Sequence, residues 1–418
     1  MASLRTKASQ TLASALRGQA VTAARRRRTM STTARRAFQV EVPGWASPEA
    51  RTALEGFAAR FGTDPSQPAM VETQHLDQHQ AALLRLTLSE MVPLDQEAGA
   101  EPKVFAHSPE RQYAGLSNRT RLLPTEHLAY FTPRVASWNL GADGSDTSFN
   151  PPGGVFTRRM WAGGEMRFQA DAPQLLLGER AYEHTFVEDA QLKQLGGGRG
   201  EMIVVWVRKE FGRRTKQEEA PLPPSIIDRR SWVFQRALPP SAEQQQQQNQ
   251  EQEQGLQAPS GAFHPDMPAP VRLVQTPASL FRYSALTFNA HAIHLSPTWA
   301  RDVEGHRDIV VHGPLTLSLL VRTWGRDHGR WFFLRKRGGS AIEPSSGRRL
   351  VSVAYRAKRP LYAGEPYWLG YAREGQDEAA GKHTLVAVKA DGQVAMEATV
   401  LSAAPSAAAA ATTEENSA

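Results

Sequence analysis

Residues 283–294 read YSALTFNAHAIH, and residues 312–315 read HGPL. The two segments bring together three imidazole side chains, His291, His294 and His312. In the second segment a glycine and a proline follow the histidine, which is a pattern typical of a helix N-terminus, because glycine allows close approach to the backbone and proline suits the first turn. We therefore expect a histidine-rich loop that lies close to the start of a helix.

This arrangement suits proton chemistry beside a carbonyl group. His294 is the main candidate for a general acid/base, because an imidazole titrates near working pH. The backbone amide of Gly313 would point out of the helix N-terminus, with Pro314 in the first turn, and could stabilise a developing oxyanion. His312 is a supporting candidate, although it could simply end a strand.

The second half of the chain reads as one helix followed by an antiparallel sheet. The pattern predicts a helix over residues 314–324. The strands are expected at residues 331–334, 350–357, 366–371, 385–389 and 394–401. We expect the tail, residues 403–418, to be disordered because it is rich in alanine and small polar residues.

The first half reads as helix and then sheet. Residues 45–90 are predicted to be helical, with a start signal at Ser47-Pro48 and a second helix over 79–92. Alternating patterns predict strands at the residue ranges 180–187, 201–208 and 231–236. The Gln-rich segment that follows, 241–268 in the predicted domain scheme, reads as a linker because its composition cannot build a core.

The histidine-rich segment resembles the MaoC-like hydratase/dehydratase signature, whose core reads Asp-x-Asn-Pro-(Leu/Ile)-His. Aligning the last residue places His294 on the family's histidine, His291 on its asparagine and Asn289 on its aspartate. The wider wording is similar to the fungal hydroxyacyl-thioester dehydratase type 2 subgroup, which includes mesaconyl-CoA hydratase-like proteins. Residues 156–165 (FTRRMWAGGE) and 360–366 (PLYAGEP) match further motifs of that subgroup.

The resemblance implies an α+β double hot-dog fold with a helical N-terminal extension. The expected parts are a non-catalytic first hot-dog half that forms the acyl tunnel and a catalytic second half, joined by the linker and preceded by a leader and the helical extension. Their expected boundaries are 1–38 for the leader, 39–120 for the extension, 121–240 and 269–402 for the two halves.

The implied activity is reversible dehydration of (3R)-3-hydroxyacyl thioesters, on acyl carrier protein or coenzyme A, in mitochondrial fatty acid synthesis. Two alternatives stay open: a C4 or C5 dicarboxylyl-CoA hydratase, which would need a cationic residue in the acyl site, and a non-catalytic module that binds acyl-ACP. Thioesterase activity is a weaker option. A homodimer is one assembly that the resemblance allows.

Asn289 departs from the family pattern, because an amide can orient a water but cannot take its proton. Either His294 acts largely alone or another group supplies the second acid/base, and Glu165 and His312 are the candidates. His291 is expected to support the loop or the reaction. Arg158 could meet a phosphate of the carrier, although a solvated strand edge is equally consistent with its position.

Composition excludes several classes of function. The chain has no cysteine, so thiolate metal sites and cysteine nucleophiles are excluded. His291 and His294 have a spacing that a metal could use on a helix, but no third ligand is evident, and we predict neither a metal nor a cofactor. No apolar stretch is long enough to span a bilayer.

The basic character of the chain comes from its N-terminus. The chain's 418 residues carry a formal net charge of +7, but residues 1–40 alone hold nine basic residues and no acidic one, so the rest is close to neutral. A nucleic-acid footprint on the folded part is therefore not expected. An acid-free leader rich in Arg, Ser, Thr and Ala is typical of a mitochondrial transit peptide, which predicts import into the matrix.

Overall fold

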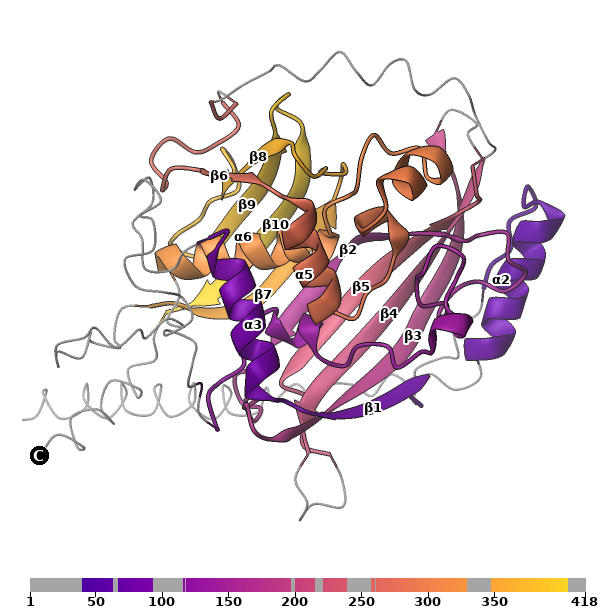
Figure 1. Cartoon of the computed structure of the whole chain (residues 1–418). Coiled ribbons are helices and arrows are strands. Elements are labelled where there is room, and N and C mark those ends of the chain that lie inside the picture. The colour runs from indigo at the N-terminus through magenta and orange to yellow at the C-terminus, as the bar shows by residue number, and fades with distance from the viewer. Residues whose placement is uncertain are drawn as a thin grey trace, which may run out of the picture. The chain divides into compact units, whose positions relative to one another are not determined.

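A single antiparallel sheet of ten strands runs through the folded part of the chain (Figure 1). The computed structural model describes residues 40–62, 67–92, 116, 118–196, 200–214, 221–238, 257–259, 261–328 and 347–404. The strand order across the sheet is β1-β3-β4-β5-β2-β7-β10-β9-β8-β6. The predicted transit peptide, most of the Gln-rich linker, the predicted strand at 331–334 and the C-terminal tail lie outside the described residues.

The order contains the same five-stranded unit twice. The strands of the first unit are β1 (Met70–His75), β2 (Arg158–Phe168), β3 (Arg180–Gln194), β4 (Glu201–Arg213) and β5 (Ile226–Gln235). Those of the second unit are β6 (Val271–Val274), β7 (Arg349–Ala357), β8 (Pro366–Tyr371), β9 (Lys382–Lys389) and β10 (Val394–Ala403). Numbered within its unit, each set is arranged first, third, fourth, fifth, second, and the two second strands, β2 and β7, pair to join the units. The predicted double hot-dog architecture is confirmed.

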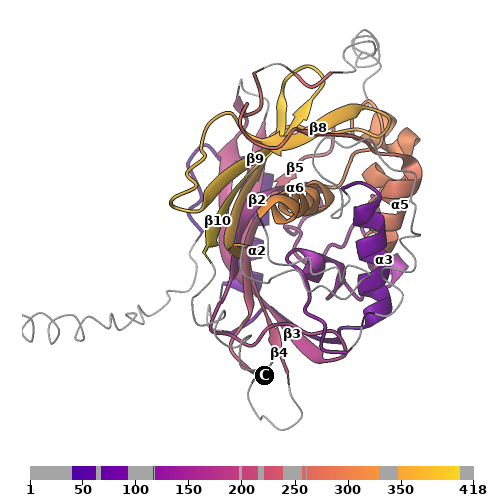
Figure 2. The ribbon, with the colours of Figure 1, turned by 90° about the vertical axis from the view of Figure 1, so that its left-hand side faces the viewer.

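The helix α6 (Gly313–His328) lies between the sheet and a layer formed by α3 (Gln78–Ser89) and α5 (Pro277–Leu286) (Figure 2). Every residue of α6 from Leu315 to Gly325 is buried. A helix that is enclosed on all sides must belong to the core, and α6 packs against β7, β8, β9 and β10. It is the central helix predicted for the second half.

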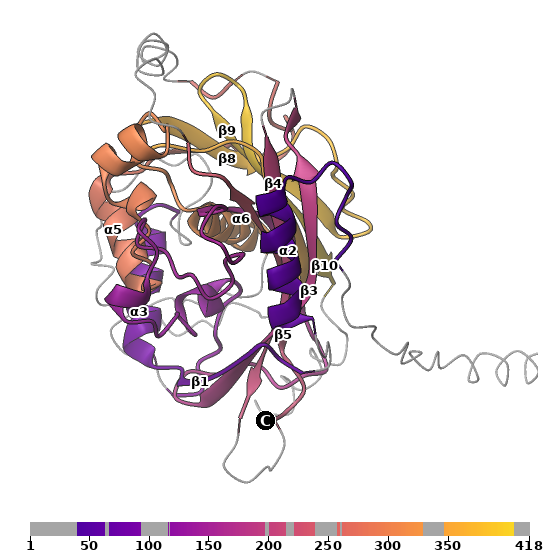
Figure 3. The same cartoon turned by 90° about the vertical axis from the view of Figure 1, so that its right-hand side faces the viewer.

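The helix α2 (Pro48–Phe61) packs against β3 and β4 (Figure 3). Its start is local in origin: the Ser47 hydroxyl accepts a hydrogen bond from the Ala50 amide, and Pro48 occupies the first turn. Its apolar face, which includes Leu54 and Phe57, joins a core cluster with residues of both strands. The predicted helix start is confirmed.

The predicted helical reading of residues 45–90 is wrong at its centre, where β1 pairs with β3 at the edge of the sheet. A long-range pairing with β3 thus overrides the local pattern of this stretch. The first unit therefore begins within the range expected to be a separate extension. Between residue 116 and β2, the described residues form only the short 3-10 helices η1 (Glu126–Ala129) and η2 (Ser137–Asn139), so the central helix expected for the first half is not seen there.

None of the helices in the described part of the chain combines the length and the apolar character that crossing a bilayer requires.

Candidate active site

The histidine-rich loop begins where α5 ends. Phe288 has a positive φ of 48°, and the next amide, that of Asn289, donates a hydrogen bond back to the carbonyl of Ser284 at 2.8 Å. The side-chain Oδ1 of Asn289 accepts a hydrogen bond from the backbone amide of His291 at 3.1 Å. This is the turn-forming contact that Asn and Asp side chains typically make. In this structure the side chain of Asn289 therefore shapes the loop that presents the histidines.

The ring of His294, at the end of the 3-10 helix η4 (Ala292–His294), has a fixed proton arrangement. Its Nδ1 lies 2.7 Å from the carbonyl oxygen of Val310. A carbonyl can only accept, so Nδ1 carries the hydrogen and Nε2 holds a lone pair. Burial, together with the nearby His291, lowers the pKa of His294 to about 3 despite the Val310 hydrogen bond. The ring is thus neutral at physiological pH, and its Nε2 can accept a proton.

His294 Nε2 is also accessible. It makes no hydrogen bond to any residue within the described ranges, and it is not among their fully enclosed polar atoms. By contrast, the Nε2 of His291 and the Nδ1 of His312 are fully enclosed. By the same criteria the Nδ1 of His291 is neither hydrogen-bonded within the described ranges nor fully enclosed, so His294 Nε2 and His291 Nδ1 are the ring nitrogens of this group that a small molecule can reach.

The start of α6 lies directly beside this ring. His312 stacks on His294, with ring centroids 3.7 Å apart, and its Nε2 lies 2.8 Å from the hydroxyl of Ser284. The carbonyl of His312 accepts the amide of Thr316 at 3.1 Å, which places His312 at the N-cap of the helix. Gly313 is the first residue of α6, as predicted, and its amide is bonded to nothing in the described part of the chain. A free amide at a helix N-terminus is a donor for a carbonyl oxygen.

Gly313 has a second reason to be glycine. A Cβ atom at this position would lie 2.5 Å from a ring carbon of Trp161, which belongs to β2. The indole of Trp161 is therefore packed directly against the backbone at the start of α6. Pro314 follows it in the first turn of the helix, as the sequence predicts.

A loop of the first unit meets the histidine loop of the second. The carbonyl of Asp143 accepts the amide of Ala292 at 2.7 Å. The neighbouring Gly144 has a φ of +75°, and a Cβ there would lie 2.3 Å from the carbonyl oxygen of Ala290. Only glycine fits both the left-handed backbone and the close approach. The candidate site is thus built from both units.

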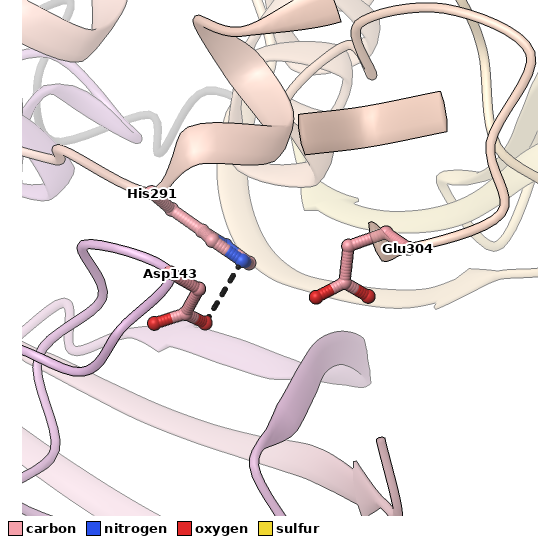
Figure 4. A group of neighbouring side chains, drawn as sticks. All are labelled: Asp143, His291 and Glu304. Atoms are coloured by element: carbon pink, nitrogen blue, oxygen red, sulfur yellow. Dashed lines mark ion pairs between the residues drawn. The ribbon is translucent and has the colours of Figure 1, made fainter. Parts of the chain in front are cut away.

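This contact brings a carboxylate to the imidazoles. Asp143 Oδ2 lies 3.1 Å from His291 Nε2, and both side chains are almost fully buried (Figure 4). Burial alone would raise the pKa of Asp143, but His291 and hydrogen bonds from Ser145 lower it to about 2. Asp143 is therefore ionised at physiological pH. An ionised carboxylate therefore lies beside the histidine loop, where Asn289 offers only an amide.

Glu304 faces the imidazole of His291 from the side opposite to Asp143 (Figure 4). It follows the short π-helix η5 (Trp299–Val303), and its Oε2 accepts a hydrogen bond from Arg158 Nε at 2.6 Å. Arg158, which the sequence suggested for a carrier phosphate, also donates to the carbonyl of Glu304 at 3.1 Å. The structure thus directs Arg158 toward Glu304.

Three potential metal ligands therefore converge. The ligand atoms of Asp143, His291 and Glu304 all lie within 4.8 Å of one another. The sequence did not reveal that these three residues come together. Each carboxylate already has a cationic or imidazole partner, because Asp143 pairs with His291 and Glu304 pairs with Arg158. A cation bound here would compete with the guanidinium of Arg158 for Glu304. The arrangement suits proton transfer through the imidazole.

Glu165, the other candidate for the second acid/base, faces away from this site. It lies on β2 next to Met166, which is fully buried in the core cluster around α6. Because successive residues of a strand point to opposite faces, Glu165 lies on the other side of the sheet, where it pairs with Arg167 at 3.0 Å. The hypothesis that Glu165 serves the reaction is wrong.

Sequence reasoning missed Asp143 and Glu304. The available signal for Asp143 was the pair Asp143-Gly144, because an aspartate followed by glycine favours a turn. It went unused because the family signature lies in the second half, and the first half was expected to be non-catalytic. Glu304 gave no signal, because a single acid after a short helix has no distinctive pattern.

Comparisons with known proteins identify the family to which the chain is similar. The family model described as hydroxyacyl-thioester dehydratase type 2 matches residues 125–363, more than half of the chain. Mesaconyl-C(4)-CoA hydratase of Chloroflexus aurantiacus is 29% identical over 283 residues, which cover 67% of this chain and 83% of the relative. Hydroxyacyl-thioester dehydratase type 2, mitochondrial, of Schizosaccharomyces pombe is 24% identical over 266 residues, 59% of this chain and 76% of the relative.

One of two similar solved structures supports the fold. A MaoC-like dehydratase matches with a TM-score of 0.50 at 13% identity, covering 84% of this chain and all (100%) of that one. A MaoC-like dehydratase from Phytophthora capsici gives a TM-score of 0.48 at 14% identity, with 82% and 98% covered. From the extent of the family match, together with a histidine loop and a helix N-terminus in the order of the family's motifs, the chain belongs to the hydroxyacyl-thioester dehydratase type 2 family.

Proposed function

We propose that the protein catalyses the reversible dehydration of (3R)-3-hydroxyacyl thioesters to trans-2-enoyl thioesters. Its membership of a dehydratase family supports hydro-lyase activity. The observation that carries the proposal is the position of the neutral His294. Its Nε2 is free, and its ring stacks on His312, the residue directly before Gly313. This combination offers a base and an oxyanion donor next to each other.

In the dehydration direction, His294 Nε2 takes the proton from C2 of the acyl group. The Gly313 amide donates a hydrogen bond to the thioester oxygen, where negative charge develops as the C–H bond breaks. The electron pair left on C2 forms the double bond to C3 and expels the 3-hydroxyl. That hydroxyl needs a proton to leave as water.

The pair formed by His291 and Asp143 is placed to provide this proton. Asp143 is ionised, so it cannot be the donor itself, but its carboxylate lies 3.1 Å from His291 Nε2 and can orient that ring. We assign proton donation to His291, with Asp143 as its positioning residue. The proton on His294 then returns to His291, whose ring centroid lies 5.5 Å away, through a water. In hydration the same steps run backwards.

The carrier and compartment extend the proposal. The Schizosaccharomyces pombe relative is named a mitochondrial protein, and the first 40 residues of this chain have the composition of a transit peptide. We therefore propose the mitochondrial matrix as the location and acyl carrier protein in fatty acid synthesis as the carrier. A dicarboxylyl-CoA substrate is the second candidate, favoured by the named substrate of the Chloroflexus relative and by a buried arginine described below.

The test is hydration of crotonyl-CoA, followed as loss of the enoyl absorbance, with the full-length chain. His294→Gln removes the base and should lower kcat by about 10²–10⁴-fold. His79→Gln is the matched control, because His79 is an exposed imidazole on α3, and its replacement should leave kcat unchanged.

Three outcomes would overturn the proposal. Equal activity of the His294→Gln and wild-type proteins would remove His294 from the reaction. Absence of hydration with both CoA and ACP thioesters of several lengths would favour the non-catalytic acyl-binding module. Release of free thiol without loss of the double bond would indicate a thioesterase.

A further inference from the structure

A second group of buried polar side chains lies in the first unit, on the inner face of the sheet. Asp228 and Arg230 belong to β5 and alternate with the exposed Arg229. Asp228 pairs across the sheet with Met166, which packs in the core around α6, so Asp228 and Arg230 point to the same side as that core. The interior that was expected to form an apolar acyl tunnel therefore contains charges.

These side chains are enclosed but incompletely bonded. Asp228 is fully buried and forms an ion pair with Arg230, whose side chain is 13% exposed. His127 of η1 lies 3.7 Å from Asp228 Oδ2, and its side chain is 0% exposed. Within the described residues, Asp228 Oδ1, Arg230 Nε and both ring nitrogens of His127 have no hydrogen-bond partner. The hydroxyl of Tyr355 on β7 is enclosed and unbonded as well.

The neighbouring charges of the same interior are satisfied, which sets this group apart. Arg85 and Glu126 form a bidentate pair at 2.6 and 2.8 Å. Glu183 accepts hydrogen bonds from Lys209 and Thr185. Buried polar groups are normally hydrogen-bonded, so several open donors gathered at one place indicate a missing ligand or ordered water.

The group adjoins the candidate active site through two tyrosines. Gly164 lies between Arg230 and Tyr355 on the sheet, and a Cβ there would be 2.8 Å from the Tyr355 hydroxyl, so the missing side chain lets the phenol reach over toward Arg230. The ring of Tyr355 stacks on Trp161 at 4.4 Å, and Trp161 packs against Gly313.

The second tyrosine, Tyr283, lies beside one of the histidines. The ring of Tyr283 lies 5.1 Å from that of His312. Burial raises the pKa of Tyr283, and this rise is opposed first by Ser318 and then by the positive charge of Arg230, which acts on the phenol electrostatically. Tyr283 therefore lies between Arg230 and the histidine loop, and Tyr355 lies between Arg230 and the start of α6.

We propose that Arg230, Tyr355 and His127 form a binding site for a carboxylate at the far end of the substrate's acyl chain. The proposal rests on the proposed hydro-lyase function and names its substrate class: 2-enoyl or 3-hydroxyacyl thioesters of dicarboxylic acids. Arg230 Nε, the Tyr355 hydroxyl and a ring nitrogen of His127 are donors that are enclosed in the unliganded structure, so a carboxylate that accepts from them must enter as the side chains around them move apart. A terminal methyl group would leave each donor buried without a partner.

The experiment compares pairs of substrates that differ only in replacement of the terminal methyl by a carboxylate. The pairs are crotonyl-CoA with fumaryl-CoA, trans-2-hexenoyl-CoA with trans-2-hexenedioyl-CoA, and trans-2-octenoyl-CoA with trans-2-octenedioyl-CoA. For the pair whose length reaches Arg230, the full-length protein should favour the dicarboxylyl substrate in kcat/KM by roughly tenfold or more, the range expected of a charged hydrogen bond.

Two variants test the assignment to residues. Tyr355→Phe removes only a hydroxyl that is unbonded in the structure, so it should fold and should reduce the preference. Arg230→Met is combined with Asp228→Asn, because Asp228 alone would be left as an uncompensated buried charge. The double variant should abolish the preference. The matched control is Arg229→Met, since Arg229 neighbours Arg230 on the opposite face and is 52% exposed, and it should leave the preference unchanged.

The outcomes separate this inference from the proposed function. If crotonyl-CoA is hydrated but no dicarboxylyl substrate is preferred at any length, the carboxylate site is refuted and the hydro-lyase proposal stands. A preference that survives both Tyr355→Phe and the double variant also refutes the site. If no thioester of either kind is hydrated, the proposed function itself fails.

Discussion

At the scale of single residues, the protonation state of His294 follows from one backbone carbonyl. The Val310 oxygen requires the hydrogen on Nδ1, and burial keeps the ring neutral. The result is a base that needs no carboxylate partner to fix its tautomer. The carboxylate that the site does contain, Asp143, acts on the neighbouring His291.

Asp143→Asn tests this division of roles. The amide retains an oxygen for Ser145 but loses the negative charge that faces His291 Nε2. We expect kcat for crotonyl-CoA hydration to fall by about 10²-fold. An unfolding curve that matches wild type would show that the loss is chemical.

Asn289→Asp is the informative counterpart. If the family's aspartate were merely missing, restoring it would raise the rate. Asn289 Oδ1 already accepts the His291 amide, and an aspartate would do the same, so we expect kcat to stay within about twofold of wild type. A large increase would mean that Asp143 does not replace the family's carboxylate.

At the scale of elements, the site depends on the meeting of two loops from different units. The Asp143 loop and the histidine loop are joined by one backbone hydrogen bond and by the close approach of Gly144 to Ala290. Neither loop carries the complete site. Separating them by a few tenths of an ångström would loosen the ion pair between Asp143 and His291.

Gly144→Ala should therefore reduce kcat by more than its loss of folding stability would explain. The new methyl would meet the Ala290 carbonyl oxygen at 2.3 Å and push the loops apart, and we expect kcat to fall at least tenfold, since small misplacements of catalytic groups are costly. Gly154→Ala is the control, because Gly154 has a similar φ of +67° but nothing within 4 Å of its Cβ position.

Both variants carry the strain of a left-handed alanine, about 1–2 kcal/mol. Gly144→Ala adds the steric cost of the Ala290 contact, so its thermal unfolding midpoint should fall further than that of Gly154→Ala, and only Gly144→Ala should lose activity. Equal kcat values in the two variants would show that the loop contact does not matter for the reaction.

At the scale of the whole molecule, the joined sheet encloses a number of histidines in neutral form. Burial lowers the pKa of His294 to about 3 and that of His383, a residue of β9 that contacts Trp324 of α6, to about 4. It also lowers the pKa of His127 and that of His312. Between these values and the ordinary 6.5, the unfolded chain binds protons that the folded chain does not. Stability is therefore lost as the pH falls below about 6.5.

Each such histidine should contribute about 1.4 kcal/mol per pH unit to this loss. The measurement is the free energy of unfolding in denaturant at several values between pH 7.5 and 4.5. His383→Gln keeps an acceptor for the Trp324 indole, which donates to His383 Nδ1 at 3.1 Å, but cannot be protonated. It should make the slope shallower, and an unchanged slope would contradict the assignment.

The sequence by itself determined the features whose contacts are local. The helix starts at Ser47 and Gly313 follow from caps and prolines that are consecutive in the chain, and the strands β7 to β10 lie where the sequence predicts strands, whereas β6 was not predicted. His294 and Gly313 were identified because the chain carries both in short segments. These choices depend on backbone preferences of a few adjacent residues.

Only the tertiary structure decided what the two units share. The strand β1, the approach of Asp143 to His291 and the pairing of Glu304 with Arg158 join residues that are distant in the chain. The face of Glu165 could not be fixed either, because in a strand a change of one position reverses the direction of a side chain. Sheet order and register set these contacts, and no local pattern encodes them.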